Sequence, residues 1–165
     1  MPILDANSLE FISRSPEQTR RVGMRLGAML EVGDTVCLEG ELGSGKTTLV
    51  QGIASGWGSL DAVSSPTFVL INIYRRADGQ RLAHMDAYRM DSPIEAEALD
   101  LADLLEAGPL IVEWAPRIAD VLPEERFWLQ LRTIDEEQRA IQISAHGGRY
   151  ESLIDHLQEA MFGVA

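Results

Sequence analysis

Residues 40–49 read GELGSGKTTL, and this stretch decides the fold class. Gly40, Gly45, Lys46 and Thr47 satisfy the pattern G-x-x-x-x-G-K-[ST]. Glycines at this spacing let the backbone curl until successive N–H groups face a phosphate group. The following helix N-terminus adds its dipole, the lysine reaches the outer phosphate oxygens, and the threonine offers a hydroxyl to Mg²⁺. The stretch therefore predicts a phosphate-binding loop, and Lys46 within it is the only lysine of the chain.

The segments on either side supply the context that such a loop requires. A strand over Thr35–Glu39, with the apolar centre Val-Cys-Leu, leads directly into Gly40. A helix is expected from Lys46 to Ser55. A strand before the loop and a helix after it disfavour the alternative of a glycine-rich turn without a ligand.

The rest of the chain alternates between strand and helix patterns. Upstream, Ser15 followed by Pro16 and Gln18 resembles a helix N-cap with a first-turn proline and a capping box, so a helix is expected from Pro16 to Leu30. The other expected segments are an edge strand at Ser8–Ile12, a hairpin of Val69–Tyr74 and Arg81–Met85, a helix at Ser92–Leu105, a strand at Leu110–Glu113, a second hairpin of Phe127–Leu131 and Ala140–Ser144, and a closing helix at Tyr150–Met161.

This order of elements predicts the fold class. Apolar strands alternating with helices are typical of a three-layer α/β fold of the P-loop NTPase type, with a mixed, mostly parallel sheet flanked by helices. A chain of 165 residues without a repeat or a linker is expected to form a single domain, residues 1–165.

Composition and charge exclude several classes of function. The chain has 26 acidic and 14 basic residues, a net charge of −12, which repels nucleic-acid phosphates and disfavours direct, tight binding of tRNA or DNA. Oriented N–H groups and one buried cation can still bind an anion locally. No apolar run is long enough to cross a membrane, no signal-peptide pattern opens the chain, and the lone Cys37 cannot form an internal disulfide. We therefore expect a cytoplasmic protein with no membrane association.

Three residues outside the loop are placed to complete a nucleotide site. Thr67 follows a proline between the loop helix and the first hairpin, where a switch segment can sense a γ-phosphate and Mg²⁺. Asp86 and Glu113 each end a strand, and the carboxyl ends of parallel strands form the edge where doubly wound sheets bind ligands. Either carboxylate can hold Mg²⁺ directly or through water, and Glu113 can instead orient the attacking water.

Each candidate also has a plainer explanation. Thr67 can belong to an ordinary Ser-Pro turn, and either carboxylate can be a helix cap or a solvated side chain. A single histidine on a strand is usually structural, so His84 receives no catalytic role. Arg89 and Arg117 can stabilise developing charge or form surface ion pairs.

Four motifs, in their order and spacing, resemble the TsaE family, also called YjeE-like ATPases: GELGSGKTT at 40–48, SSPTF at 64–68, HMDAYR at 84–89 and IVEW at 111–114. The likeness covers residues 15–117. It implies a protein that binds and hydrolyses ATP and supports formation of N6-threonylcarbamoyladenosine at position 37 of tRNAs. In such a family the carbamoyl transfer belongs to a TsaD-like partner, a TsaB-like protein completes the complex that engages the tRNA, and hydrolysis resets the complex between turnovers.

The resemblance also implies roles for individual residues, with ATP/ADP and Mg²⁺ as the cofactors. Thr47 and Glu113 are expected to hold Mg²⁺, with Asp86 as a third candidate, and Thr67 is expected to act as the switch. The residues expected to serve hydrolysis are Lys46, Asp86, Glu113 and Thr67. Those expected near the nucleotide are Gly43, Ser44, Gly45, Lys46, Thr47, Thr48, Trp114, Ser15 and Arg139.

Two other functions use a similar loop. A small-molecule kinase would need an acceptor-binding lid, whereas the segment between the loop helix and Glu113 contains a hairpin and one helix. A GTPase-type switch would carry the guanine-reading motif N-K-x-D, which the chain lacks because its single lysine lies in the phosphate loop. ATP is therefore the expected nucleotide, and phosphorylation of a small metabolite would favour the kinase.

Overall fold

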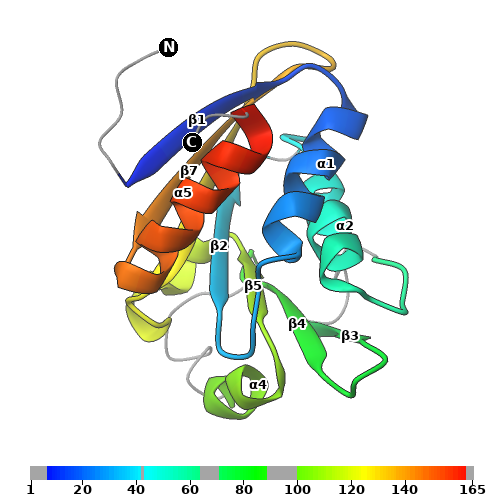
Figure 1. The fold of residues 1–165 in the computed structure, drawn as a ribbon, viewed down its shortest axis with the longest axis vertical. Helices are drawn as coiled ribbons and strands as arrows, with labels where there is room; N and C mark the ends of the chain where they lie inside the picture. The colour runs from blue at the N-terminus through cyan, green and yellow to red at the C-terminus, as the bar shows by residue number, and fades with distance from the viewer. Residues whose placement is uncertain (1–6, 42, 64–70, 89–99, 163–165) are drawn as a thin grey trace.

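The computed structural model describes residues 7–41, 43–63, 71–88 and 100–162. Figure 1 shows a central sheet with helices on both of its faces. The elements, in chain order, are β1 (Ser8–Ser13), α1 (Pro16–Gly27), β2 (Thr35–Gly40), α2 (Lys46–Trp57), β3 (Ile71–Arg75), β4 (Arg81–Asp86), α4 (Leu101–Ala107), β5 (Leu110–Glu113), the 3₁₀ helix η1 (Ala115–Val121), β6 (Arg126–Thr133), β7 (Arg139–His146) and α5 (Gly148–Phe162).

The seven strands form one mixed sheet in the order β1-β7-β6-β2-β5-β4-β3. The central strands β6, β2, β5 and β4 are parallel to one another, whereas β7 pairs antiparallel with β6 and β1 on one side, and β3 pairs antiparallel with β4 on the other. Only β7 and β3 therefore run against the common direction. The predicted mixed, mostly parallel sheet is confirmed.

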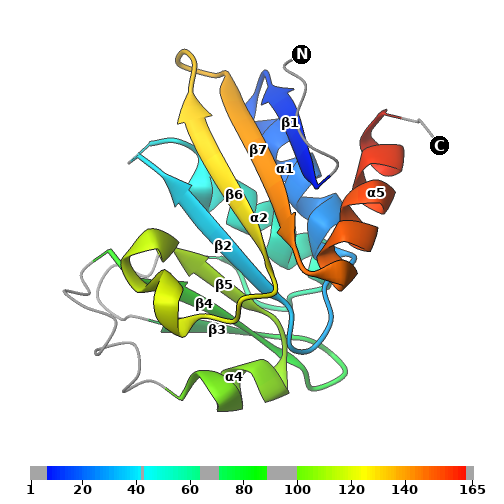
Figure 2. The same cartoon turned by 90° about the vertical axis from the view of Figure 1, so that its left-hand side faces the viewer.

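Two apolar cores lie on opposite faces of this sheet. One core packs α1, α2 and α5 against the sheet, with Leu26, Ile53 and Leu157 among its buried residues. The other packs α4 and η1 against the opposite face, around Met85 and Ile118. Figure 2 shows the two sets of helices on their separate sides. The predicted three-layer arrangement follows from these cores, and within the described residues no helix is long and apolar enough to span a membrane.

Most expected elements are present with small differences at their ends. Helix α1 ends at Gly27 rather than Leu30, because the N–H groups of Met29 and Leu30 bond to carbonyls only three residues back and no longer follow the α-helical pattern. Helix α2 continues two residues beyond Ser55 and stops at Gly58, whose φ of 105° favours glycine.

The helix expected over Ser92–Leu105 is confirmed from Leu101 onward, but it is not continuous through Asp100. Residues 89–99 lie outside the described part of the chain, so its predicted start is not described. At Asp100 the backbone has a ψ of 79°, and the side chain accepts a hydrogen bond from the Asp103 N–H. Asp100 is therefore an N-cap that begins α4 afresh at Leu101, since an aspartate side chain competes for the first free N–H groups of a helix.

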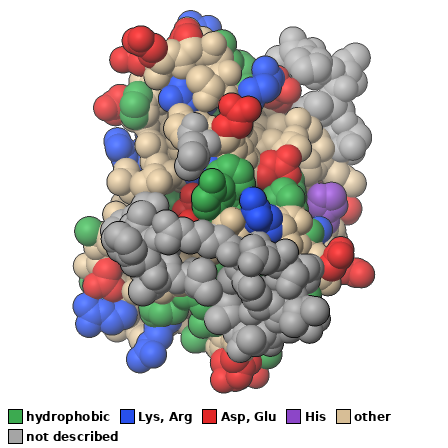
Figure 3. All heavy atoms as spheres, turned by 180° about the vertical axis from the view of Figure 1, so that it is seen from behind, with side chains coloured by type: hydrophobic (Ala, Val, Ile, Leu, Met, Phe, Trp, Pro, Cys, Tyr) green, Lys and Arg blue, Asp and Glu red, His purple; other side chains and the backbone are tan. Residues whose placement is uncertain are grey.

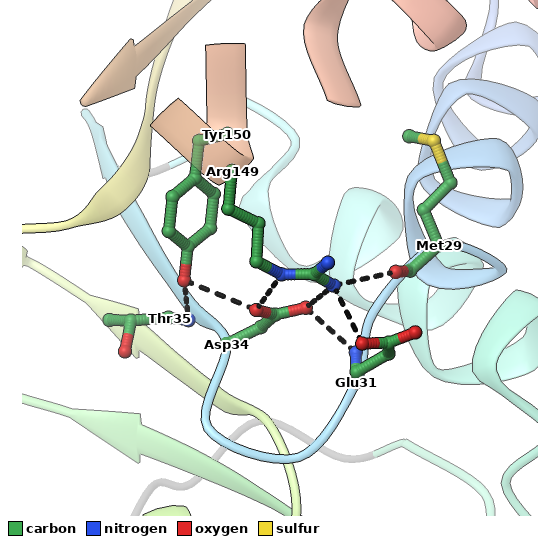
Figure 4. Close-up of polar contacts among 6 residues, drawn as sticks. All are labelled: Met29, Glu31, Asp34, Thr35, Arg149 and Tyr150. Atoms are coloured by element: carbon green, nitrogen blue, oxygen red, sulfur yellow. Dashed lines mark hydrogen bonds and ion pairs between the residues drawn. The ribbon is translucent and has the colours of Figure 1, made fainter. Parts of the chain in front are cut away.

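A buried polar network fixes the start of β2 to α5 (Figure 4). The Asp34 carboxylate is only 3% exposed and accepts two hydrogen bonds of 2.7 Å from Nε and Nη2 of Arg149. The Tyr150 hydroxyl accepts from the Thr35 N–H at 2.9 Å, and the Glu31 N–H donates to Asp34 at 2.7 Å. A buried charge needs such partners, so the turn before β2 is held where the strand must start.

Two buried acidic groups make the fold sensitive to alkaline pH. Burial raises the pKa of the Cys37 thiol to about 12, and burial together with the nearby Asp34 carboxylate raises the pKa of Tyr150 to about 12. The folded state therefore holds both protons more tightly than the unfolded chain. This stability is fully present below about pH 9 and is lost as the pH rises towards 12, by roughly 4 kcal/mol for Cys37 and at most roughly 3 kcal/mol for Tyr150.

We expect the free energy of unfolding, measured by urea titration from pH 8 to pH 11.5, to fall steadily above pH 9. Cys37→Ala and Tyr150→Phe should each reduce the slope of this fall, whatever they do to stability at neutral pH. An unchanged slope in both variants would show that neither group causes the alkaline loss.

Candidate functional site

The phosphate loop, β4 and β5 meet at the carboxyl edge of the sheet around one pocket of about 310 Å³. Every residue that lines it belongs to the set predicted from sequence. The lining residues are Gly43, Gly45, Lys46, Thr47, Thr48, Asp86, Glu113, Trp114 and Arg139.

The loop is shaped by glycines whose conformations other residues adopt poorly. Gly43 and Gly45 have φ values of 79° and 99°. At Gly40 the reason is close approach, since a Cβ there would lie 2.6 Å from the Ser44 hydroxyl oxygen and 2.7 Å from the Leu131 carbonyl oxygen. Ser44 is consequently buried behind the loop and does not line the pocket.

Lys46 begins α2 and is only 6% exposed. Its ammonium donates hydrogen bonds to the Gly40 carbonyl and, at 3.0 Å, to the Glu41 carbonyl, and it lies 4.4 Å from the centroid of the Trp114 ring. Burial lowers the pKa of Lys46, while the carboxylates of Glu113 and Asp86 oppose that shift. The single lysine thus sits at the pocket wall among groups that stabilise its positive charge.

Asp86 and Glu113 are neighbours because β4 and β5 pair in parallel with these two residues in register. Burial raises the pKa of Asp86, partly offset by the Tyr88 N–H that donates to it at 2.8 Å. Two carboxylates and the Thr47 hydroxyl around one pocket are a hard oxygen donor set of the kind that Mg²⁺ prefers. In the described ranges no group of three His, Cys, Asp or Glu side chains is arranged for a metal.

Trp114 has the one positive φ, 58°, among the described non-glycine residues. This left-handed conformation is costly for a bulky residue and persists only where surrounding contacts enforce it. The Trp114 ring lies 4.8 Å from the Tyr88 ring, and the Arg117 guanidinium lies 5.5 Å from the Tyr88 centroid. The Lys46 ammonium also lies over the indole, which forms one wall of the pocket within a stack of rings and cations.

Arg139, at the start of β7, closes another side of the pocket. It donates to the Gly43 carbonyl at 3.1 Å and to the carbonyls of Asp135 and Gln138 at 2.7 and 2.9 Å. Arg139 thereby ties the turn between β6 and β7 to the phosphate loop.

Two of the predicted residues that the structure describes, Ser15 and Ser44, do not line this pocket. Ser15 is the N-cap of α1, where its hydroxyl accepts the Gln18 N–H at 3.2 Å, and it does not line the pocket. Thr67 lies outside the described residues, as does Arg89. Their predicted roles stay predictions.

Sequence reasoning missed two residues behind Glu113. His84 Nε2 lies 2.5 Å from Oε2 of Glu113, and His84 Nδ1 lies 2.8 Å from the Tyr74 hydroxyl. In the sequence, His84 looks like a structural histidine on a strand. The sequence does contain one indication of its role behind Glu113. His84 lies two residues before Asp86, which places both side chains on the same face of β4.

Comparison with known proteins identifies the family of the chain. Residues 13–141 match the family model described as threonylcarbamoyl adenosine biosynthesis protein TsaE. All of the residues that line the pocket lie within this matched range.

Individual relatives are similar over most of their length. A Bacillus subtilis protein named tRNA threonylcarbamoyladenosine biosynthesis protein TsaE is 39% identical over 151 residues, covering 90% of this chain and 93% of that protein. A Streptomyces coelicolor protein of the same name is 39% identical over 137 residues, covering 79% and 93%. The crystal structure of Bacillus subtilis YdiB superposes with a TM-score of 0.77 at 33% identity, covering 93% of this chain and 96% of that one. The chain therefore belongs to the TsaE family.

Proposed function

We propose that this chain is the Mg²⁺-dependent ATPase subunit of a cytoplasmic complex that forms N6-threonylcarbamoyladenosine at position 37 of tRNAs. In this proposal residues 1–165 form one P-loop ATPase domain that hydrolyses ATP weakly alone and faster with TsaD-like and TsaB-like partners. The observation that carries it is the single pocket that joins the phosphate loop to Asp86, Glu113 and Trp114. Family membership and the names of the relatives support the tRNA modification.

In this proposal the residues of the pocket have separate roles in binding phosphate, binding Mg²⁺ and orienting water. The loop N–H groups and Lys46 bind the phosphates and stabilise charge on their oxygens. Mg²⁺, when bound, supplies further positive charge to those oxygens. The Thr47 hydroxyl and one or both of the carboxylates of Glu113 and Asp86 would hold that ion. If Glu113 does not bind the ion, its carboxylate would orient the attacking water. The remaining proposed contacts are the switch residue Thr67 and the nucleotide neighbours Trp114, Ser15 and Arg139.

The charge distribution supports an indirect role for tRNA. The net charge of −12 opposes binding of a polyanion. Figure 3 shows acidic and basic side chains interspersed over the described part of one face, without a continuous basic patch there. We therefore assign the tRNA to the partners rather than to this chain.

Reconstitution tests the proposal. The chain is combined with TsaD-like and TsaB-like proteins, tRNA and ATP, and both the modified nucleoside and the released phosphate are measured. Phosphate release should rise when the partners and tRNA are added, and the modified nucleoside should require ATP. Unchanged ATP turnover together with phosphorylation of a small metabolite would establish the kinase instead.

Glu113→Gln should reduce Mg²⁺-dependent ATP turnover by about 100-fold while β5 stays folded. The amide keeps the size of the side chain but removes the charge that the ion or the attacking water requires. Phosphate release over a Mg²⁺ titration measures the effect. Glu39→Gln is the matched control, because Glu39 lies near the end of β2 but bonds Trp128 and Gln130 and does not line the pocket. Equal turnover in the Glu113 variant and the wild type would show that Glu113 neither binds the ion nor orients the water.

A further inference from the structure

We propose that Tyr74 and His84 are positioning residues that set the orientation of Glu113 at the pocket. The proposal rests on the ATPase function proposed above and adds to it a buried relay reaching two strands behind the carboxylate. No ligand contact is assigned to Tyr74 or His84, since neither lines the pocket.

The relay crosses three adjacent strands, with Tyr74 on β3, His84 on β4 and Glu113 on β5. The three residues are 3%, 0% and 5% exposed. The Tyr74 hydroxyl is 2.8 Å from Nδ1 of His84, and Nε2 of His84 is 2.5 Å from Oε2 of Glu113. Both ring nitrogens are therefore engaged, and water cannot readily replace either contact at this burial.

Donor and acceptor rules give the relay one direction when Glu113 is ionised. A carboxylate only accepts, so Nε2 must carry the hydrogen that points at Oε2. At Nδ1 the Tyr74 hydroxyl is the partner in either case: it donates to a bare Nδ1 and accepts from a protonated one. The opposite tautomer would direct a nitrogen lone pair at the carboxylate oxygen, which is repulsive at 2.5 Å.

This arrangement makes the two carboxylate oxygens of Glu113 inequivalent. Oε2 is bound by His84, which fixes the rotation of the carboxylate at the pocket that Glu113 lines. Partners behind a ligand side chain fix its rotation in the same way in metal sites, where their removal typically costs 10- to 100-fold in affinity or activity. Glu113 needs such help because β5 is only four residues long and ends at Glu113 itself.

Tyr74→Phe is the most specific test, because it removes only the hydroxyl that is hydrogen-bonded to Nδ1 of His84. We expect kcat for ATP to fall about 10-fold and the Mg²⁺ concentration for half-maximal turnover to rise. Affinity for nucleotide without Mg²⁺, measured with a fluorescent ADP analogue, should change less than twofold. Tyr150→Phe is the matched control, since it removes another buried, hydrogen-bonded tyrosine hydroxyl at the far end of β2 and should leave kcat unchanged.

Substitution of His84 tests the donor itself. His84→Gln can still direct an amide N–H at Glu113, so it should retain more turnover than His84→Ala, which has no donor. Equal kcat values for wild type, Tyr74→Phe and His84→Gln, at equal Mg²⁺ dependence, would overturn the proposal.

Nitrogen-15 NMR of the chain without nucleotide separates this proposal from the ATPase proposal. We expect His84 to carry a hydrogen on Nε2 in the wild type, and to do so only in part of the molecules in Tyr74→Phe. If wild-type protein with its partners fails to hydrolyse ATP but Nε2 of His84 carries this hydrogen, the ATPase proposal fails and the relay stands. If hydrolysis is present but His84 carries its hydrogen on Nδ1, the relay is wrong and the ATPase proposal stands.

Discussion

Lys46→Ala should reduce ATP hydrolysis by about two to three orders of magnitude while changing the free energy of unfolding by no more than about 1 kcal/mol. The ammonium is the one cation of the phosphate loop, and it opposes charge that grows on the phosphate oxygens during the reaction. Its present contacts, two backbone carbonyls and the Trp114 ring, contribute less to the fold because burial penalises the charge. Phosphate release with partners and urea unfolding of the chain alone measure the two effects.

Lys46→Arg is the informative companion variant. It keeps the positive charge, but a planar guanidinium is larger and binds by a rigid fork rather than as a compact ammonium. We expect it to recover little of the lost hydrolysis, which would explain why a chain with thirteen arginines uses lysine here. A large loss of stability in Lys46→Ala, accompanied by near-normal hydrolysis, would instead make Lys46 a structural residue.

Gly27→Ala should lower the free energy of unfolding by about 3 kcal/mol or more, although alanine favours helices by about 1 kcal/mol over glycine. Helices α1 and α2 lie side by side in Figure 1 and approach closely through glycines on both. A Cβ at Gly27 would lie 2.0 Å from the Ile53 carbonyl oxygen, and one at Gly56 would lie 2.0 Å from the Met24 carbonyl oxygen. Backbone atoms cannot move aside as a flexible side chain can, so the helices must separate.

Gly148→Ala is the matched control, because it adds the same methyl group at the start of α5 with no atom within 4 Å. Its unfolding free energy should stay within about 0.5 kcal/mol of wild type. Thermal or urea unfolding of both variants decides the matter. If Gly27→Ala were as stable as Gly148→Ala, the close contact between α1 and α2 would not be a requirement of the fold.

Several parts of the fold and site could be predicted because they depend on local spacing. The phosphate loop is recognised by residues within ten positions of one another, and Ser15 with Gln18 marks the start of α1. Asp86 and Glu113 could be expected at one edge because each follows an apolar strand. Asp100 shows the limit of this approach, since a helix-like pattern on both sides of it concealed an N-cap.

Glycines at spacings of four also mark where two helices pack closely. Gly23 and Gly27 on α1, with Gly52 and Gly56 on α2, allow close helix packing, but either pair alone is also compatible with an ordinary helix. Their meaning depends on which two helices become neighbours, and that is a property of the folded chain.

By itself the sequence determined the α/β fold class, the phosphate loop around Lys46 and the carboxylates that face it, because short-range patterns and strand order encode them. Only the tertiary structure decided how Glu113 is held. His84 lies 29 residues before Glu113 in the chain, and their contact depends on the parallel register of β4 and β5. Register is set by packing across the whole sheet, so a histidine that looks structural in the sequence becomes, in the folded protein, the partner of a pocket carboxylate.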